Sequence, residues 1–415
     1  MSSTRTPGTV TVGSPLRLRC GIALPNRLAK AAMSEQLGTI AGAPSPTLVR
    51  LYSAWGRGGA GLLITGNVMI DRRAYVEPRN VTLEDDRHLE EFGNWARAGG
   101  RDGAVMVMQI NHPGRVAVGP LHRKPVGPSA VRPAVPGYNL RKPRELTVAD
   151  IADLRRRYVR TAELAVRAGF AGVQIHAAHG YLLSQFLSPI ANRRTDGYGG
   201  GPGGRSRLLL EVVADVRAAI GPHALVSVKL NSADFQQGGL DIDESLDIAL
   251  ALERAGIDLL EISGGNYEAP AMTGVVADRT RAREAYFLDY ALRLRARTTT
   301  LPLMLTGGLR TARFMNDVLG AGSIDVVGMA RPFALRPDVA HRLLAGESEP
   351  ATLPGAPQLP AWPGMAPVNS YLQLAWHARN FRALAGGAAV VTGPGAARTL
   401  LGAGLSVTAH ALTQP

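Results

Sequence analysis

The chain holds one cysteine, Cys20, among its 415 residues. A single cysteine excludes an intrachain disulfide, and it excludes an iron–sulfur cluster ligated by the chain's own cysteines. Long apolar runs are missing as well, because none approaches the ~20 residues that a membrane span requires. The opening sequence MSSTRTPGTV also lacks the apolar segment of a secretory signal. We therefore expect a cytoplasmic protein without a membrane partner.

Lysine is scarce too, although the formal net charge is +13. Only Lys30, Lys124, Lys142 and Lys229 are lysines, so the positive charge comes from arginines scattered along the chain. No nucleic-acid-binding module is recognisable, and we expect no nucleic-acid partner. A positive field would nonetheless attract phosphorylated small molecules.

Short apolar runs bounded by Gly, Pro or Asp alternate with segments of helical periodicity. The expected strands are 27–33, 61–69, 105–111, 172–179, 225–231, 259–265, 302–308 and 324–330. The expected helices are about 46–58, 87–98, 147–170, 205–220, 243–255, 284–298, 310–320 and 335–344. The third of them opens with a Thr-x-x-Asp pattern, Thr147 to Asp150, that resembles a capping box. Continuous apolar strands are typical of a parallel sheet, and eight strand–helix units predict an α/β fold, the (β/α)8 TIM barrel. An open, doubly wound sheet is the alternative.

The remaining segments predict additions to this barrel. An N-terminal hairpin at 16–26 should plug its lower end, and the proline-rich stretch 112–146 should form a loop or lid over the active face. We place the barrel domain at 1–345 and a Pro/Gly-rich linker, one helix (369–384) and a tail at 346–415. Residues 390–404 look like a dinucleotide-binding turn but lack its third glycine, so we interpret them as tail.

Ionisable residues gather where the predicted strands end, which in a barrel is the active face. His176 and His179 follow the fourth strand, and two imidazoles there can donate hydrogen bonds to one ligand oxygen. A metal site is less favoured because no third ligand is evident. Tyr181 is either a proton donor or a loop aromatic, and its position alone does not decide.

Lys229 and two glycine-containing motifs complete the candidate site. Lys229 ends a buried strand, so we expect a bound anion or a Schiff base there in preference to a salt bridge across the barrel mouth. TGG at 306–308 and GMARP at 328–332 end the last two strands. Phosphate sites of such barrels lie in this position, where glycine backbones and the planar Arg331 fork can bind the anion.

Several of these stretches together resemble the Old Yellow Enzyme family of FMN-dependent ene-reductases, in the family's order over about residues 14–345. They are LPNRLAKAAMSEQ, QINHPGR, PRELT, AGFAGVQIHAAHGYLLSQFLSPIANRRTDGYGG and LTGGLR followed by GMARPF. The resemblance implies a TIM barrel that holds FMN at its C-terminal mouth and is reduced by NADPH or NADH. The residues at the family's cofactor positions are Ala32, Met33, Ser34, Gln109, Lys229, Gly307, Gly308, Ala330 and Arg331.

The chain departs from the family's pattern at four places. Ala330 stands where the family commonly has Gly, and Lys229 stands where it often has Arg. Ser34 replaces a Thr or Cys that tunes the flavin potential, and GPGGR at 201–205 replaces the usual Ser-x-x-Asn-Arg. We also expect no second domain with iron–sulfur and dinucleotide sites after the barrel.

The resemblance implies an FMN-dependent oxidoreductase that moves hydride from NAD(P)H through flavin N5 to the β-carbon of an α,β-unsaturated carbonyl. His176 and His179 would grip the carbonyl and Tyr181 would protonate the α-carbon. Two alternatives stay open: flavin-dependent oxidation or rearrangement of a biosynthetic intermediate with O2 as acceptor, and a flavin-free lyase that forms a Schiff base at Lys229. The partner would be a small molecule with an activated C=C bond. The sequence is compatible with a homo-oligomer in which Arg379 or Arg382 of one subunit enters the site of a neighbouring subunit.

Overall fold

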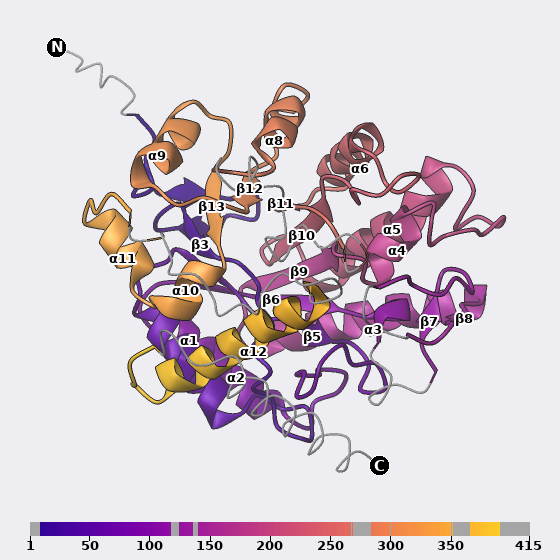
Figure 1. Ribbon diagram of the computed structural model, residues 1–415, viewed down its shortest axis with the longest axis horizontal. Coiled ribbons are helices and arrows are strands. Elements are labelled where there is room, and N and C mark those ends of the chain that lie inside the picture. Colours follow the sequence, from indigo (N-terminus) through magenta and orange to yellow (C-terminus); the bar gives the residue numbers. More distant parts are fainter. Residues whose placement is uncertain are drawn as a thin grey trace.

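The computed structural model describes residues 9–117, 124–135, 140–266, 268, 284–298, 300–349, 351 and 366–390, with backbone alone for 366–371 and 374. Eight parallel strands close into a ring, because β4 pairs with β3 on one side and with β6 on the other. Figure 1 shows these strands following one another from β3 through β13, β12, β11, β10 and β9 to β6. The predicted TIM barrel is confirmed, and the open sheet is wrong.

The eight barrel strands agree closely with the apolar runs of the sequence. They are β3 (Leu28–Lys30), β4 (Leu62–Ile64), β6 (Val105–Asn111), β9 (Gly172–Ala177), β10 (Leu225–Asn231), β11 (Leu259–Ser263), β12 (Leu303–Thr306) and β13 (Val326–Met329). The run expected at 61–69 is two strands, because the second, β5 (Val68–Met69), pairs with the far end of β6 and forms a single bridge from Met69 to Thr82. The first strand ends at Lys30, three residues early, so Met33 lies in a loop.

The hairpin at the N-terminus closes the lower end of the barrel as predicted. Its strands β1 (Leu16–Arg17) and β2 (Ala23–Leu24) pair antiparallel. Leu18, Cys20 and Leu24 are buried in one apolar cluster with interior side chains from the strands, including Leu225 and Leu259 at strand starts. Burying this layer removes apolar surface from water, which stabilises the folded state by roughly 25 cal/mol for each Å² buried.

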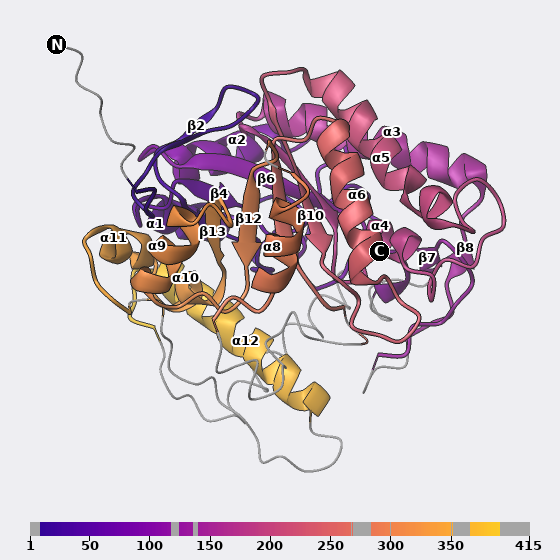
Figure 2. The same ribbon diagram turned by 90° about the horizontal axis from the view of Figure 1, so that it is seen from above.

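Helices surround the ring, and Figure 2 shows α3, α5 and α6 side by side outside the strands. They are α1 (Pro46–Gly56), α2 (Leu89–Gly100), α3 (Val148–Arg167), α4 (Leu182–Leu187), α5 (Pro202–Ile220), α6 (Ile242–Arg254), α8 (Leu288–Arg295), α9 (Ala312–Gly320), α10 (Arg331–Leu335), α11 (Val339–Leu344) and α12 (Ala366–Ala385). Thr147 and Asp150 form the expected capping box of α3. The helix expected at 335–344 is wrong in extent, because the chain leaves the helical path around Pro337 and forms α10 and α11 instead.

Two additions lie outside the strand–helix repeat. Within the predicted lid 112–146, the structure describes the short helix η1 (Gly114–Val116) and the pair β7 (Val126–Gly127) and β8 (Arg144–Glu145), while 118–123 and 136–139 lie outside the described residues. Helix α12 packs against α1 and α10 of its own chain (Figure 2). The tail beyond residue 390, including the segment 391–404, lies outside the described residues. Among the described helices, each is too short or too polar to cross a bilayer.

Candidate functional site

One rim of the barrel collects the residues that the sequence singled out. Parallel strands all end at the same edge, so the side chains that follow them face a common mouth. Inside the barrel, side chains alternate: Leu225 and Leu259 belong to the apolar layer near the hairpin, and four residues later on the same strands Lys229 and Ser263 lie near the mouth. The interior therefore changes from apolar to polar along its axis.

His176 and His179 lie together at the end of β9, as predicted. Their ring centroids are 5.2 Å apart at an interplanar angle of 78°. His176 accepts the Ala178 backbone N–H on Nδ1 at 3.3 Å, which places the proton of a neutral ring on Nε2. Burial lowers the pKa of both rings well below the ordinary value, and the charge of Lys229 adds to this effect. Both imidazoles are therefore neutral at physiological pH.

A left-handed backbone orients His179, whose φ is 62°. Its N–H donates to Asn231 Oδ1 at 3.1 Å, and its Nε2 lies 2.8 Å from the Ser263 hydroxyl. This conformation is unfavourable in free energy for a non-glycine residue, so it persists only where surrounding contacts stabilise it. Such residues cluster at functional sites. The strand ends of β10 and β11 thus fix the second imidazole, through two partners that the sequence did not reveal.

Tyr181 is buried beside this pair. Its ring centroid is 4.7 Å from that of His176, nearly perpendicular to it, and the residue is 5% exposed. It packs in a cluster with Tyr75, Val76 and Val116, which brings the loop after β5 and the turn after β6 against it. Tyr181 directly precedes α4, a helix that the sequence analysis did not foresee.

Lys229 corrects one expectation. It forms a buried ion pair with Glu261, with 2.8 Å between Nζ and Oε1, so the salt bridge that the sequence disfavoured is present. The two residues are partners in the parallel register of β10 and β11, so their side chains leave the same face of the sheet. Glu261 escaped attention because it stands within the apolar run LLEIS; a charged residue inside such a run was the available signal.

Glutamine side chains extend this pair across the barrel. Gln174 donates to Glu261 Oε2 at 2.8 Å, and Gln109 donates to Gln174 Oε1, also at 2.8 Å. Gln109, Gln174 and Glu261 are at most 2% exposed, so all three are shielded from water. Gln174 lay in the predicted strand but was not recognised as part of the site.

A second buried network holds the turn that carries Ala32, Met33 and Ser34. Lys30 Nζ donates to Tyr52 Oη at 2.9 Å, to the Ile64 carbonyl at 2.8 Å and to Glu35 at 3.3 Å. Burial lowers the pKa of Lys30 to about 8, against the opposing charge of Glu35. The turn after β3 is therefore anchored to α1, which explains a fully buried lysine that the sequence left unassigned.

The predicted phosphate residues lie at the ends of β12 and β13. Gly307 and Gly308 have φ of 136° and 80°, a region that favours glycine. A Cβ on Gly308 would lie 2.6 Å from the Tyr286 ring, so aromatic side chains pack directly on this turn. Ala330 precedes α10, and Arg331 is exposed as its first residue.

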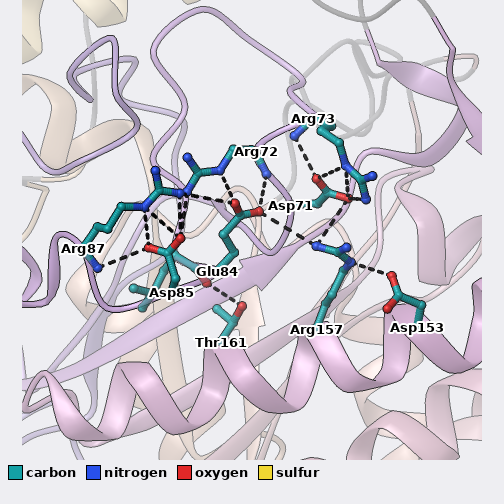
Figure 3. A network of polar contacts seen from close by, with 10 residues as sticks. Asp71, Arg72, Arg73, Glu84, Asp85, Arg87, Asp153, Arg157 and Thr161 are labelled. Carbon is teal, nitrogen blue, oxygen red and sulfur yellow. Dashed lines mark hydrogen bonds and ion pairs between the residues drawn. The ribbon is translucent and has the colours of Figure 1, made fainter.

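A salt-bridge network, shown in Figure 3, fixes the loop of residues 70–88. Tyr75 and Val76 of this loop pack in one cluster with Tyr181. Glu84 pairs with Arg72 and lies 3.9 Å from Arg157 of α3, and Asp71 contacts the same arginine at 3.8 Å. Thr161 of α3 donates to the Leu83 carbonyl at 2.6 Å. The loop is thereby fastened to the barrel wall on its outer side.

The same loop brings a carboxyl group to the mouth. Glu77 lies beside the side chains of Ser34 and Gln36, and burial raises its pKa to about 7. Its Oε2 is buried and finds no hydrogen-bond partner among the described residues. Nothing in the sequence marked Glu77, because the contact depends on how the loop folds back toward β3.

The described residues contain no group of three or more His, Cys, Asp or Glu side chains that could hold a metal ion.

Comparison with known proteins gives one consistent family. The model of the NADH:flavin oxidoreductase / NADH oxidase family matches residues 14–349. NADH-dependent flavin oxidoreductase iccE of Talaromyces variabilis is 35% identical over 406 residues, covering 89% of this chain and 97% of that protein. NADH-dependent flavin oxidoreductase iliE of Neonectria sp. (strain DH2) is 36% identical, and the match spans 78% of this chain but 46% of that protein.

Solved structures give the same result. Morphinone reductase superimposes with a TM-score of 0.69 at 26% identity, covering 82% of this chain and 91% of that one. The old yellow enzyme homologue from Zymomonas mobilis has the same TM-score and identity, with 84% and 95% covered. The chain therefore belongs to the NADH:flavin oxidoreductase / NADH oxidase family, the Old Yellow Enzyme family, and is a flavin oxidoreductase with FMN as cofactor and a nicotinamide nucleotide as reductant.

Proposed function

We propose that the chain reduces an activated C=C bond of an α,β-unsaturated carbonyl compound at the mouth of the barrel. The observation that carries the proposal is the placement of two neutral imidazoles and a buried phenol at the end of one strand, beside the Lys229–Glu261 pair on the next strands. Hydrogen-bond donors without charge suit a neutral carbonyl, and a phenol is a proton donor at neutral pH.

The residues present fit a flavin. Three buried polar groups at strand ends find no hydrogen-bond partner among the described residues: the Asn111 amide, the Ser232 hydroxyl and the Thr306 hydroxyl. Buried polar groups are normally satisfied, so such atoms at one rim indicate a ligand with its own donors and acceptors. In our proposal Ala32, Met33, Ser34, Gln109 and Lys229 contact the ring system. Gly307, Gly308, Ala330 and Arg331 hold the phosphate, beside the Tyr286 ring.

Each side chain then has a defined task. His176 donates from Nε2 to the substrate carbonyl oxygen, because its Nδ1 is engaged by the Ala178 N–H. His179 supports the same oxygen from a backbone that Asn231 holds in place. Tyr181 delivers a proton to the α-carbon from a buried position, which keeps water away from the reacting atoms. Bound FMN supplies the hydride that it receives from NADH or NADPH.

Replacing Tyr181 with Phe tests this assignment. We expect the oxidation of reduced enzyme by cyclohexenone to slow by about 10²- to 10⁴-fold, the usual contribution of a general acid. Reduction by NADH should keep its rate, because that half-reaction needs no proton from the phenol. Stopped-flow measurement of the yellow flavin absorbance follows both steps. An equal loss in the two half-reactions would contradict the role of Tyr181.

Oxygen is the acceptor in the second candidate function, oxidation or rearrangement of a biosynthetic intermediate. A relative from Thermoanaerobacter brockii, 32% identical over 323 residues, carries the name NADH oxidase, which supports this candidate. Product analysis under strictly anaerobic conditions distinguishes the reactions, because oxidation stops without O2, enone reduction continues and consumes NADH, and a rearrangement continues without consuming NADH. The flavin-free lyase has less support, because the Lys229 ammonium is engaged as the counter-ion of Glu261.

A further inference from the structure

The strongest unassigned feature is a continuous polar chain across the barrel interior just below the mouth. It runs from Lys229 on β10 through Glu261 on β11 and Gln174 on β9 to Gln109 on β6, with 2.8 Å at each contact. Its four members are at most 4% exposed as residues or side chains. The two residues at its ends, Gln109 and Lys229, are residues that we propose to contact the flavin.

Glu261 occupies the centre of this chain and faces both ends. One carboxylate oxygen neutralises the Lys229 ammonium, and the other accepts a hydrogen bond from the Gln174 amide. With its nitrogen committed to Glu261, Gln174 turns its oxygen toward Gln109, and this fixes the direction of the Gln109 amide as well. A single carboxylate therefore determines the charge at one end and the donor–acceptor pattern at the other.

Hydride transfer from NADH, which leaves as NAD⁺, brings two electrons and one proton to the bound flavin and so adds one negative charge. An unpaired ammonium beside the ring would stabilise that charge and favour reduction. A buried carboxylate 2.8 Å from the ammonium opposes this effect, because the interior screens charges poorly. The second buried cation, Lys30, is likewise paired, with Glu35, so no excess positive charge from these two lysines remains at the site.

We propose that Glu261 is the positioning residue that sets the reduction potential of the bound flavin, by neutralising Lys229 and by fixing the Gln109 amide through Gln174. The inference rests on the proposed flavin contacts of Lys229 and Gln109. Glu261 itself touches neither substrate nor cofactor in this assignment. Its effect is therefore on the equilibrium of flavin reduction, in addition to any effect on turnover.

The test is the midpoint potential of FMN-loaded Glu261→Gln protein, measured against a reference dye under anaerobic conditions. We expect the equilibrium constant for two-electron reduction to rise about tenfold, which corresponds to roughly 30 mV. Sulfite, which adds to electron-poor flavins, should bind about tenfold more tightly to this variant. Asp258→Asn is the matched control: Asp258 is also buried and ion-paired, with Arg217, but at the opposite end of β11. It should leave both values unchanged.

A double variant separates an effect through Lys229 from a general disturbance. In a Lys229→Met background, Glu261→Gln should shift the potential much less than in the parent protein, because the charge that it compensates is gone. If Glu261→Gln fails to retain FMN, Glu261→Asp provides the measurement, since the shorter side chain keeps its charge but retreats from Lys229 and should give a smaller rise. An FMN-loaded variant with the parent potential overturns the inference. A parent protein that takes up no FMN overturns the proposed function instead.

Discussion

Glu77 makes the stability of the protein depend on pH in a way that one substitution should remove. Burial raises the pKa of its carboxyl group from the usual 4.5 to about 7, so the folded state prefers the protonated form. Below pH 4.5 both states are protonated. As the pH rises above 4.5 the unfolded chain ionises first, and folding loses stability until the folded group ionises near pH 7. A difference of this size is worth roughly 3 kcal/mol at most.

The measurement compares parent and Glu77→Gln protein in urea at a series of pH values from 4 to 8 with a fixed excess of FMN. The amide has almost the same size and shape as the carboxyl group and cannot ionise. We therefore expect the variant to gain up to roughly 3 kcal/mol relative to the parent as the pH rises to 7, with no further gain above that. Glu90→Gln, on the exposed face of α2, controls for loss of a carboxylate in general. A difference between parent and Glu77→Gln that stays constant with pH would refute the reasoning.

Two further substitutions test the networks around the site. Among the described residues, Lys30 is the only cation that pairs with the buried Glu35 carboxylate. Lys30→Met should therefore lower the free energy of unfolding by about 3–5 kcal/mol. The control Lys124→Met, at an exposed position, should change it by less than about 0.5 kcal/mol. Urea denaturation checks both, and equal effects would contradict the role of the pair. Glu84→Gln weakens one ion pair within the 70–88 loop, with Arg72, and one contact of the loop with Arg157 of α3. Amide hydrogen exchange should speed up within that loop, whereas Glu347→Gln, in an exposed pair with Arg342, should leave it unchanged.

Sequence periodicity predicted the barrel well because its signal is local. The strand Leu225–Asn231 and the cap at Thr147 depend on neighbours within a few residues, and both were predicted at the observed positions. The same holds for His176 and Tyr181, which lie where strand β9 ends and α4 begins. Chain direction alone sends such residues to the active face.

The remaining part of the site depends on contacts between distant segments. Glu77 meets Ser34 across some forty residues of chain, and Glu261 meets Lys229 only because two strands align in register. Periodicity identifies which face a residue occupies but does not identify its partner on the next strand. For this reason the sequence disfavoured a salt bridge at Lys229, although it marked the buried cation correctly.

The layered interior of the barrel has a practical consequence for protein engineering. The apolar layer is confined to the end closed by Leu18 and Leu24, while Gln174, Lys229 and Glu261 fill the other end. The side chains proposed to tune the cofactor thus also serve as core. Directed evolution for heat resistance alone would tend to replace the charged pair with aliphatic residues, since buried ion pairs are often less stabilising than a well-packed apolar substitute. Variants selected in this way would become more stable to heat, but the reduction potential of their bound flavin would change. Selection for stability and for reduction potential therefore has to be applied together.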